Sequence, residues 1–369
     1  MIDKILARRI IMTQIGQETI NRMRTLTELH AVPGFEGEAR EYLKEQMKPF
    51  VDEIIGDNMG SIYGVKKSKK ENAPKVLVAA HMDEIGFMVT EMTKEGMLKF
   101  TPLGGVSSDV WLSQTLQLKT RDNQYYNGVV GSIPKHFRTG KESGVAIEDM
   151  LLDVGAENMQ QLKDMGINIG DTIVPRTNLE QLTENRILAK AWDNRYGCLV
   201  GLELLEAVKD IDLDVDLYVG ANVQEEVGLR GASASVNLIE PDLALVVDCS
   251  PANDMKGHIG LSGALGEGVL IRILDRTMIL SERMRDYLIN IVEEKDINHQ
   301  YFQSPGGTDG GEIHKALTGI PTAVIGVCAR YIHTSKAIYD VRDYLNAKQL
   351  LVEIVQDINK EKIEHLKYN

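Results

Sequence analysis

Five side chains of the types that bind transition metals lie beside apolar segments of this chain: His81, Asp193, Glu226, Asp248 and His333. A hydrolytic site with two metal ions needs one carboxylate that bridges the ions, and a histidine and a second carboxylate to complete each side. Asp193 is the natural bridge, because it lies at the turn into a predicted helix. Mixed imidazole and carboxylate ligands suit zinc, cobalt or manganese better than calcium or copper. The sequence therefore predicts two divalent metal ions per chain.

Two neighbours of these residues are candidates for the catalytic groups. Asp83 lies two residues after His81, so in an extended segment the side chains share a face and the carboxylate can fix the imidazole tautomer. Glu225 directly precedes Glu226, and adjacent side chains of an extended chain point to opposite sides. We therefore expect Glu226 to bind metal, while Glu225 faces the attacking water as the general base.

Four apolar segments lead into these polar residues, and each is typical of a strand buried on both faces of a sheet. They cover residues 75–80, 217–223, 243–247 and 322–327. Helical patterns occur at 17–30, 36–47, 196–209, 281–294, 312–317 and 347–360. Strands that alternate with helices predict an α/β fold with a mixed sheet, and such sheets place ligands beyond the carboxyl ends of their strands. The polar residues are therefore expected to converge.

Residues 91–180 have a different character. They contain short strand patterns at 98–102, 115–120, 128–133 and 171–174, many glycines and one short helical pattern at 157–165. This composition predicts an inserted β-rich domain. The catalytic domain would then be discontinuous, made of residues 17–90 and 181–369, and residues 1–16 would form an N-terminal extension.

Composition excludes several classes of partner. A net charge of -13 argues against binding to phosphate backbones or anionic membranes, and 5% aromatic residues leave few rings to stack on bases. No run of about 18 apolar residues occurs, so no membrane-spanning helix is expected. The three cysteines form no CxxC pair, which favours reduced thiols in the cytoplasm.

The polar motifs resemble, in order, the pattern of the M42 family of metallo-aminopeptidases, from about residue 17 to the C-terminus. The matching segments are His81-Met82-Asp83-Glu84, Trp192-Asp193-Asn194-Arg195, Gln224-Glu225-Glu226-Val227-Gly228, Asp248-Cys249-Ser250, Gly306-Gly307-Thr308-Asp309 and Tyr331-Ile332-His333. The resemblance is nearest to the glutamyl aminopeptidase branch of low-GC Gram-positive bacteria. One departure is Gly310, where relatives usually have Ala.

This resemblance implies a dimetal exopeptidase core that acts on short peptides. It also implies that the insertion is a PDZ- or barrel-like dimerisation domain and that dimers assemble into a dodecamer. By the same resemblance Glu225 is the catalytic base, Asp193 is the bridge, and Asp248 and His333 bind different ions.

A preference for N-terminal Glu or Asp is expected, with Arg272 as the cation that reads the side chain. Arg272 is the single charge in the apolar segment 268–274, and a buried arginine is costly unless a carboxylate meets it. An internal ion pair with Asp275 or Glu267 is the alternative. The glycine-rich segment 304–311 lacks the Lys-Ser or Lys-Thr of a phosphate loop, so a substrate-lining or structural turn is expected there instead, with Thr308 and Asp309 as candidate substrate-binding residues.

Other functions remain open at this stage. A deacylase, a carboxypeptidase, or a broad leucyl or deblocking aminopeptidase could use the same dimetal site. A glycosidase would need two carboxyls about 5–9.5 Å apart that flank one bond, which suits poorly two sequence neighbours with diverging side chains. A non-enzymatic scaffold is the last alternative, and the presence of all five metal-ligand candidates disfavours it.

Overall fold

The computed structural model describes residues 15–132, 145–257 and 260–368. The predicted N-terminal extension therefore lies outside the described residues, apart from Ile15 and Gly16. Ile15 is half-buried against the main hydrophobic core. Among the described residues, no helix combines the length and the apolar character needed to cross a bilayer.

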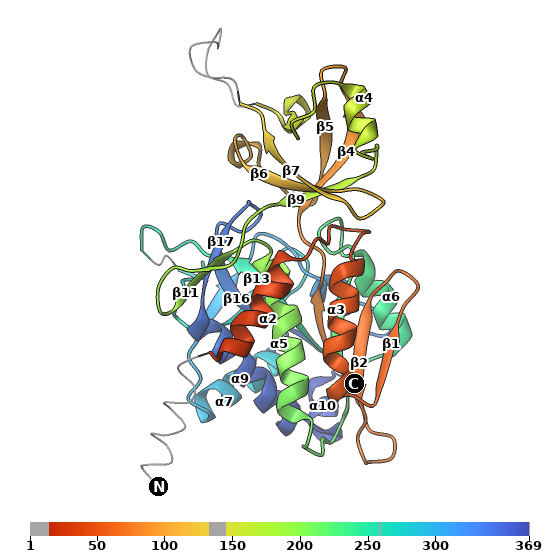
Figure 1. Cartoon of the computed structure of the whole chain (residues 1–369). Coiled ribbons are helices and arrows are strands. Elements are labelled where there is room, and N and C mark those ends of the chain that lie inside the picture. The colour runs from red at the N-terminus through yellow and green to blue at the C-terminus, as the bar shows by residue number, and fades with distance from the viewer. Residues whose placement is uncertain (1–14, 133–144, 258–259, 369) are drawn as a thin grey trace.

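The core of the molecule is a mixed sheet (Figure 1). Its strands lie in the order β1 (Glu53–Gly56), β2 (Ile62–Lys66), β12 (Asp216–Asn222), β3 (Lys75–His81), β13 (Leu243–Pro251), β16 (Thr322–Arg330), β17 (Ala337–Asp340), β11 (Arg186–Ala189) and β10 (Glu180–Gln181). Strands β14 (Val269–Leu274) and β15 (His299–Gln303) extend the sheet beside β16. The four central strands β12, β3, β13 and β16 are parallel, so their carboxyl ends share one edge.

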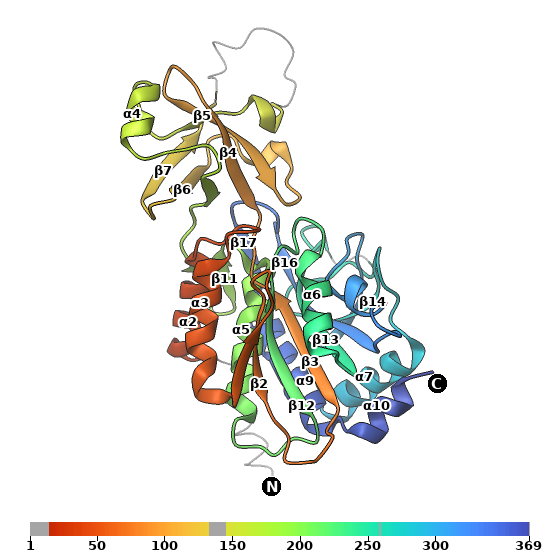
Figure 2. The ribbon, with the colours of Figure 1, turned by 90° about the vertical axis from the view of Figure 1, so that its right-hand side faces the viewer.

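Helices cover both faces of this sheet (Figure 2). Helices α2 (Gln17–Glu28), α3 (Gly37–Met47), α5 (Trp192–Val208) and α9 (Val341–Asp357) pack on one face. Helix α7 (Glu282–Glu294) contacts α9, and α10 (Lys360–Leu366) contacts α7. Helices α6 (Arg230–Ile239) and α8 (Gly310–Ile313) pack on the other. Strand β3 serves both cores, because Val76 and Val78 point to the first face and Leu77 and Ala79 to the second.

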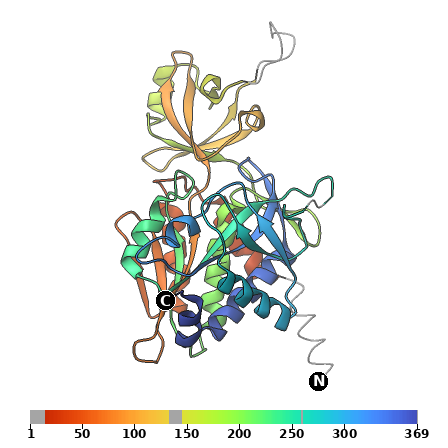
Figure 3. The same cartoon turned by 180° about the vertical axis from the view of Figure 1, so that it is seen from behind.

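The inserted unit is a closed six-stranded barrel that stands at one end of the core (Figures 1 and 3). Around the barrel the strands are β4 (Gly86–Met92), β5 (Met97–Leu103), β8 (Leu152–Asp153), β7 (Tyr125–Val130), β6 (Thr115–Lys119) and β9 (Thr172–Pro175), with helix α4 (Met159–Asp164) between β8 and β9. Phe87 packs edge-on against Phe100 and Trp111 inside it, with ring centroids 4.9 and 4.8 Å apart. The predicted α/β fold with a mixed sheet and an inserted β-rich unit is confirmed.

The first and last barrel strands begin at Gly86 and end at Pro175, whereas the sequence placed the inserted domain at 91–180. The domain boundaries therefore stay a prediction. The single helix expected at 347–360 is in fact two helices. Ile358 is extended, with φ −73° and ψ 138°, and the side chain of Asn359 caps the start of α10 by accepting a hydrogen bond from the Lys362 amide.

Candidate dimetal site

The candidate site lies at the edge where the central parallel strands end. His81 is the last residue of β3, and Glu225 and Glu226 follow shortly after β12. Asp248 was predicted to lie just beyond the end of its strand, but it lies within strand β13. Strand β13 continues to Pro251, because it stays paired with β16 as far as Ala329. The polar residues predicted to converge therefore do meet at one edge of the sheet.

Asp193 lies in a turn ahead of the regular part of α5. Its backbone angles, φ −84° and ψ 103°, are not helical, and the peptide bond between Asp193 and Asn194 is cis. The side chain of Asn194 holds this turn in place, since it donates to the Val247 carbonyl at 2.7 Å and accepts from the Gly197 amide at 3.0 Å. The turn presents the Asp193 carboxylate between two histidines.

The two oxygens of Asp193 face different imidazoles. Oδ1 lies 3.1 Å from Nε2 of His81, and Oδ2 lies 3.2 Å from Nε2 of His333. A second carboxylate accompanies each histidine. Asp248 Oδ1 is 3.7 Å from His81 Nε2, and Glu226 Oε2 is 3.7 Å from His333 Nε2. The arrangement therefore has two halves that share one carboxylate, as a bridged pair of metal ions requires.

Both imidazoles are oriented by backbone carbonyls. Nδ1 of His81 lies 3.2 Å from the carbonyl oxygen of Asp83, and Nδ1 of His333 lies 2.6 Å from that of Gly105. A carbonyl can only accept, so each Nδ1 carries a proton, and Nε2 of each ring is the nitrogen left to face Asp193. At about 3 Å, an imidazole nitrogen and a carboxylate oxygen need either a proton or a metal ion between them, so a proton occupies this position when no metal is bound.

The donor set itself fits metal ions. Donor atoms close enough together to hold one ion are offered by two sets that share His81, one with Glu225 and Asp248 and the other with Asp193 and Glu226. The first set differs from the predicted ligands, because it contains Glu225, which was expected to act as the base. Within the described part of the chain, Oε1 of Glu226 is buried without a hydrogen-bond partner. A buried carboxylate oxygen without a donor is costly, and a bound cation removes that cost.

The protonation equilibria show the same excess of negative charge. Burial raises the pKa of Glu226 to about 8, and burial with the nearby Asp248 raises the pKa of Glu225 well above its usual range. Burial opposes the charged form of His333 as well, but Glu226 and Asp193 outweigh it and raise its pKa to about 10. The pKa of Asp193 is lowered, because its contacts with the two histidines outweigh burial. Positive charge is therefore stabilised at this site.

Asp83 contacts the site differently from the prediction. Its carboxylate oxygen is 3.6 Å from Nδ1 of His81, and the hydrogen bond to the imidazole is made by its backbone carbonyl instead. The carboxylate accepts the backbone amides of Glu225 at 3.1 Å and Glu226 at 3.0 Å. Asp83 thus links the strand that carries His81 to the turn that carries both glutamates.

Next to Asp83, three buried charges tie the start of the chain to the site. The Glu84 carboxylate lies 2.6 Å from Nζ of Lys190 and 3.1 Å from the guanidinium of Arg195. Arg195 also donates to the backbone carbonyls of Leu26 and Met82. Lys190 donates to the carbonyl of Leu29 at 2.9 Å as well, so the region between α2 and α3 is fixed to the end of β3.

Arg272 lies on β14 and lines a cavity of about 330 Å³ beside Glu225 and Asp248. Its guanidinium donates to Asp275 at 3.1 Å and to Oγ of Ser250 at 2.8 Å. The internal ion pair with Asp275 is therefore formed. Nε of Arg272 is nevertheless buried without a hydrogen-bond partner among the described residues.

Thr308 and Asp309 are both buried, and neither lines that cavity. Asp309 accepts from the side chain of Asn222 at 2.8 Å. The cavity is lined instead by the preceding residues of the same glycine-rich segment, Ser304 to Gly307. Gly105 was not predicted to take part in the site. It contacts His333 through its backbone carbonyl, which no pattern of side chains in the sequence reveals.

Known proteins resemble this chain over nearly its whole length. A family model described as M42 glutamyl aminopeptidase matches residues 60–350. A glutamyl aminopeptidase of Lactococcus lactis subsp. cremoris is 42% identical, covering 95% of this chain and 99% of the relative. A lysyl aminopeptidase of Pyrococcus furiosus is 30% identical, covering 91% and 96%.

Two solved structures extend the likeness to the fold. The TET aminopeptidase of a marine sediment Thaumarchaeota archaeon superposes with a TM-score of 0.91 at 34% identity, covering 95% of this chain and 99% of that one. The TET1 peptidase of Pyrococcus horikoshii, described as able to assemble into a tetrahedron or a large octahedral shell, gives 0.83 at 25% identity, covering 92% and 100%. Core and barrel together thus have counterparts among these proteins.

Proposed function

This chain belongs to the M42 family of aminopeptidases, and from that premise we propose that it uses two divalent metal ions to release N-terminal residues, preferably Glu or Asp, from short peptides. The observation that carries the proposal is the position of Asp193, whose two carboxylate oxygens face Nε2 of His81 and Nε2 of His333. We assign His81 and Asp248 to one ion, Glu226 and His333 to the other, and Asp193 to both. Zinc, cobalt or manganese would suit these ligands.

Metal ions held here would lower the pKa of a water molecule and polarise the scissile carbonyl. Glu225 is the proposed general base. Its carboxylate lies in the same cavity, with Oε2 3.9 Å from Nε2 of His81. It accepts the proton of the attacking water and returns that proton to the leaving amine. Asp83 supports the reaction by holding the amides of Glu225 and Glu226.

The preference for acidic residues rests on Arg272. Its guanidinium lines the cavity and keeps one buried nitrogen without a partner, so a substrate carboxylate could pair with it. The Lactococcus relative is a glutamyl aminopeptidase, whereas the Pyrococcus relative is a lysyl aminopeptidase. Membership of the family alone therefore does not imply a preference for acidic residues. Roles for Thr308 and Asp309 in substrate binding stay predictions.

A panel of aminoacyl-nitroanilides, combined with metal analysis, tests this function. We expect up to two metal ions per chain, loss of activity on chelation, and recovery with zinc, cobalt or manganese. Nitroanilides of Glu and Asp with a free amino group should be hydrolysed fastest. Cleavage of N-acetylated substrates would favour a deacylase, release of C-terminal residues a carboxypeptidase, and fastest cleavage of Leu a broad-specificity enzyme. Full activity after exhaustive removal of metal would exclude the mechanism.

We further propose that the barrel mediates self-association into dimers and that dimers build a dodecamer. The support is the likeness to the TET1 peptidase, which is described as able to assemble into a tetrahedron or a large octahedral shell. A variant without residues 91–180 should sediment as a smaller species, whereas an unchanged assembly would place the interface elsewhere. Sedimentation is the proper measurement, because the deletion also removes the Gly105 carbonyl that contacts His333. The cytoplasm stays the predicted location, and the three cysteines are free and buried.

A further inference from the structure

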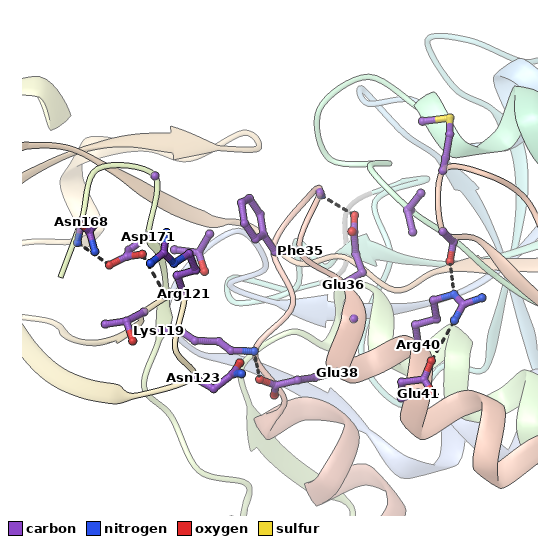
Figure 4. Close-up of a pocket in the computed structure, with 18 of the residues that line it drawn as sticks. Phe35, Glu36, Glu38, Arg40, Glu41, Lys119, Arg121, Asn123, Asn168 and Asp171 are labelled. Atoms are coloured by element: carbon purple, nitrogen blue, oxygen red, sulfur yellow. Dashed lines mark hydrogen bonds and ion pairs between the residues drawn. The ribbon is translucent and has the colours of Figure 1, made fainter. Parts of the chain in front are cut away.

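A large groove lies between helix α3 and the barrel (Figure 4), and Val223, two residues before Glu225, also lines it. Its volume is about 1120 Å³. Figure 4 shows Phe35 and Glu36 on the core side and Lys119 and Arg121 on the barrel side. Glu36 is 5% exposed, whereas its neighbour Phe35 is 47% exposed, so the two side chains have different surroundings. The burial of an acidic side chain beside an open groove requires an explanation.

The hydrogen bonds of Glu36 supply that explanation. Its Oε1 atom accepts the amide of Gly34, in its own loop, at 2.8 Å. The same oxygen accepts the amide of Gln224 at 3.1 Å. Gln224 is far away in sequence and immediately precedes the proposed base Glu225. Glu36 therefore joins the connection between α2 and α3 to the catalytic turn.

Glu36 completes a set of three contacts. The amides of Gln224, Glu225 and Glu226 are consecutive, and each donates to a buried carboxylate: the first to Glu36 and the next two to Asp83. The two carboxylates come from separate elements, Asp83 from the end of β3 and Glu36 from the loop before α3. Three consecutive amides of the turn are therefore each held by a side-chain carboxylate.

The turn needs such support, because Gln224 has φ +56°, in the left-handed region that favours glycine. A residue other than glycine keeps this conformation only when the surrounding contacts impose it. The amide of Gln224 is the contact nearest to the strained angle. If it were released, the backbone could relax and the side chain of Glu225 would be redirected.

We propose that Glu36 is a positioning residue for the hydrolytic reaction, which aims the carboxylate of Glu225 by holding the amide of Gln224. This inference rests on the proposed function, in which Glu225 is the general base. It assigns Glu36 no contact with substrate or metal. Catalytic geometry is sensitive to displacements of about 1 Å, so loss of the hydrogen bond should be visible in turnover.

Two substitutions of Glu36 separate positioning from charge. Glu36→Ala removes the acceptor and should lower kcat by about 10- to 100-fold, with KM and metal content close to those of the wild type. Glu36→Gln keeps one amide oxygen, and one carbonyl-type oxygen can accept both amides, so kcat should recover to within about threefold. Glu41→Ala, which removes an exposed carboxylate of α3, is the matched control and should behave as the wild type.

Each alternative outcome would overturn the proposal. An unchanged kcat for Glu36→Ala would show that the contact does not matter. A loss of bound metal or an equal loss of activity in Glu36→Gln would show that Glu36 acts through the metal ligands or through its charge. The wild type and Glu225→Gln are measured in parallel. If the wild type releases no N-terminal residue, or if Glu225→Gln keeps full turnover, the proposed function itself is wrong. The role proposed for Glu36 would then be wrong as well, because it depends on Glu225 as the base.

Discussion

Nδ1 of His333 lies 2.6 Å from the carbonyl oxygen of Gly105, so a proposed metal ligand of the core is held by the backbone of the barrel. Gly105 follows the end of β5, and the preceding Gly104 has φ +100°. A Cβ atom on Gly104 would come within 2.7 Å of Ile85 in the barrel and within 3.3 Å of Glu226 in the core, which glycine avoids. The close approach of this barrel loop to the core is therefore built into its sequence.

A second contact holds the same part of the core. Oγ of Ser335 donates to the Gln114 side chain of the barrel at 2.8 Å, two residues after His333. Gln114→Ala should loosen this segment and weaken metal binding on the His333 side by about 10-fold, the lower end of the range for groups that orient ligands. Metal titration measures the effect. Gln124→Ala, on an exposed part of the barrel, is the control, and identical binding curves for both variants would contradict the prediction.

The roles of Glu225 and Asp193 can be separated by isosteric changes. Glu225→Gln should lower turnover by several orders of magnitude and keep the metals, because it removes the base but no proposed ligand. Asp193→Asn should lose metal as well as activity, because the amide offers one oxygen where the carboxylate offers two. Metal analysis beside kcat decides the question. Retention of metal by Asp193→Asn together with its loss from Glu225→Gln would reverse the assignment.

Arg272→Leu tests the preference for acidic residues. It should cut hydrolysis of Glu-nitroanilide by roughly 10- to 1000-fold and spare Leu-nitroanilide. The fold should survive, because Asp275 keeps the amides of Thr277 and Met278 as donors. Arg276→Leu, at an exposed neighbouring position, is the control. Equal losses on both substrates would make Arg272 structural, and a wild-type preference for Leu would remove the acidic specificity.

Glu203 should make stability depend on pH. Burial opposes its charged form, but Lys348 and the hydroxyls of Thr19 and Tyr344 outweigh burial and lower its pKa below the ordinary 4.5. The contribution of Glu203 to the free energy of unfolding is therefore complete above pH 4.5, and it is lost as the pH falls towards the lower pKa of the folded state. Glu203→Ala should cost about 3 kcal/mol at pH 7, because it leaves the partners of a buried carboxylate unpaired.

Urea unfolding of the metal-free protein at pH 7 and at successively lower pH measures this dependence. The difference between the wild type and Glu203→Ala should shrink below pH 4.5. Glu206→Ala, on the same helix but more exposed, should cost less than about 1 kcal/mol. A difference that stays constant as the pH falls would show that Glu203 acts through packing alone.

The sequence predicted those parts of the molecule that have a side-chain pattern. The apolar run at 75–80 identified β3, and the polar residues after the central strands identified the site. Helix α6 went unrecognised, because Gly231 and two serines obscure its apolar face, and no strand was predicted at β4, which directly follows the site motif. The roles of Glu36 and Gly105 depend on backbone contacts between distant segments, which no local pattern encodes.

The buried charges of Glu84, Lys190 and Arg195 behave as one energetic unit. Removal of one of them leaves the others desolvated and without a full set of partners. Each single substitution should therefore lower the stability of the fold by far more than one third of the loss caused by removing all three. Losses from pairs of substitutions should then add up to less than the sum of the single losses. The three positions can consequently be exchanged only together, and an attempt to redesign this region one residue at a time will pass through unstable intermediates.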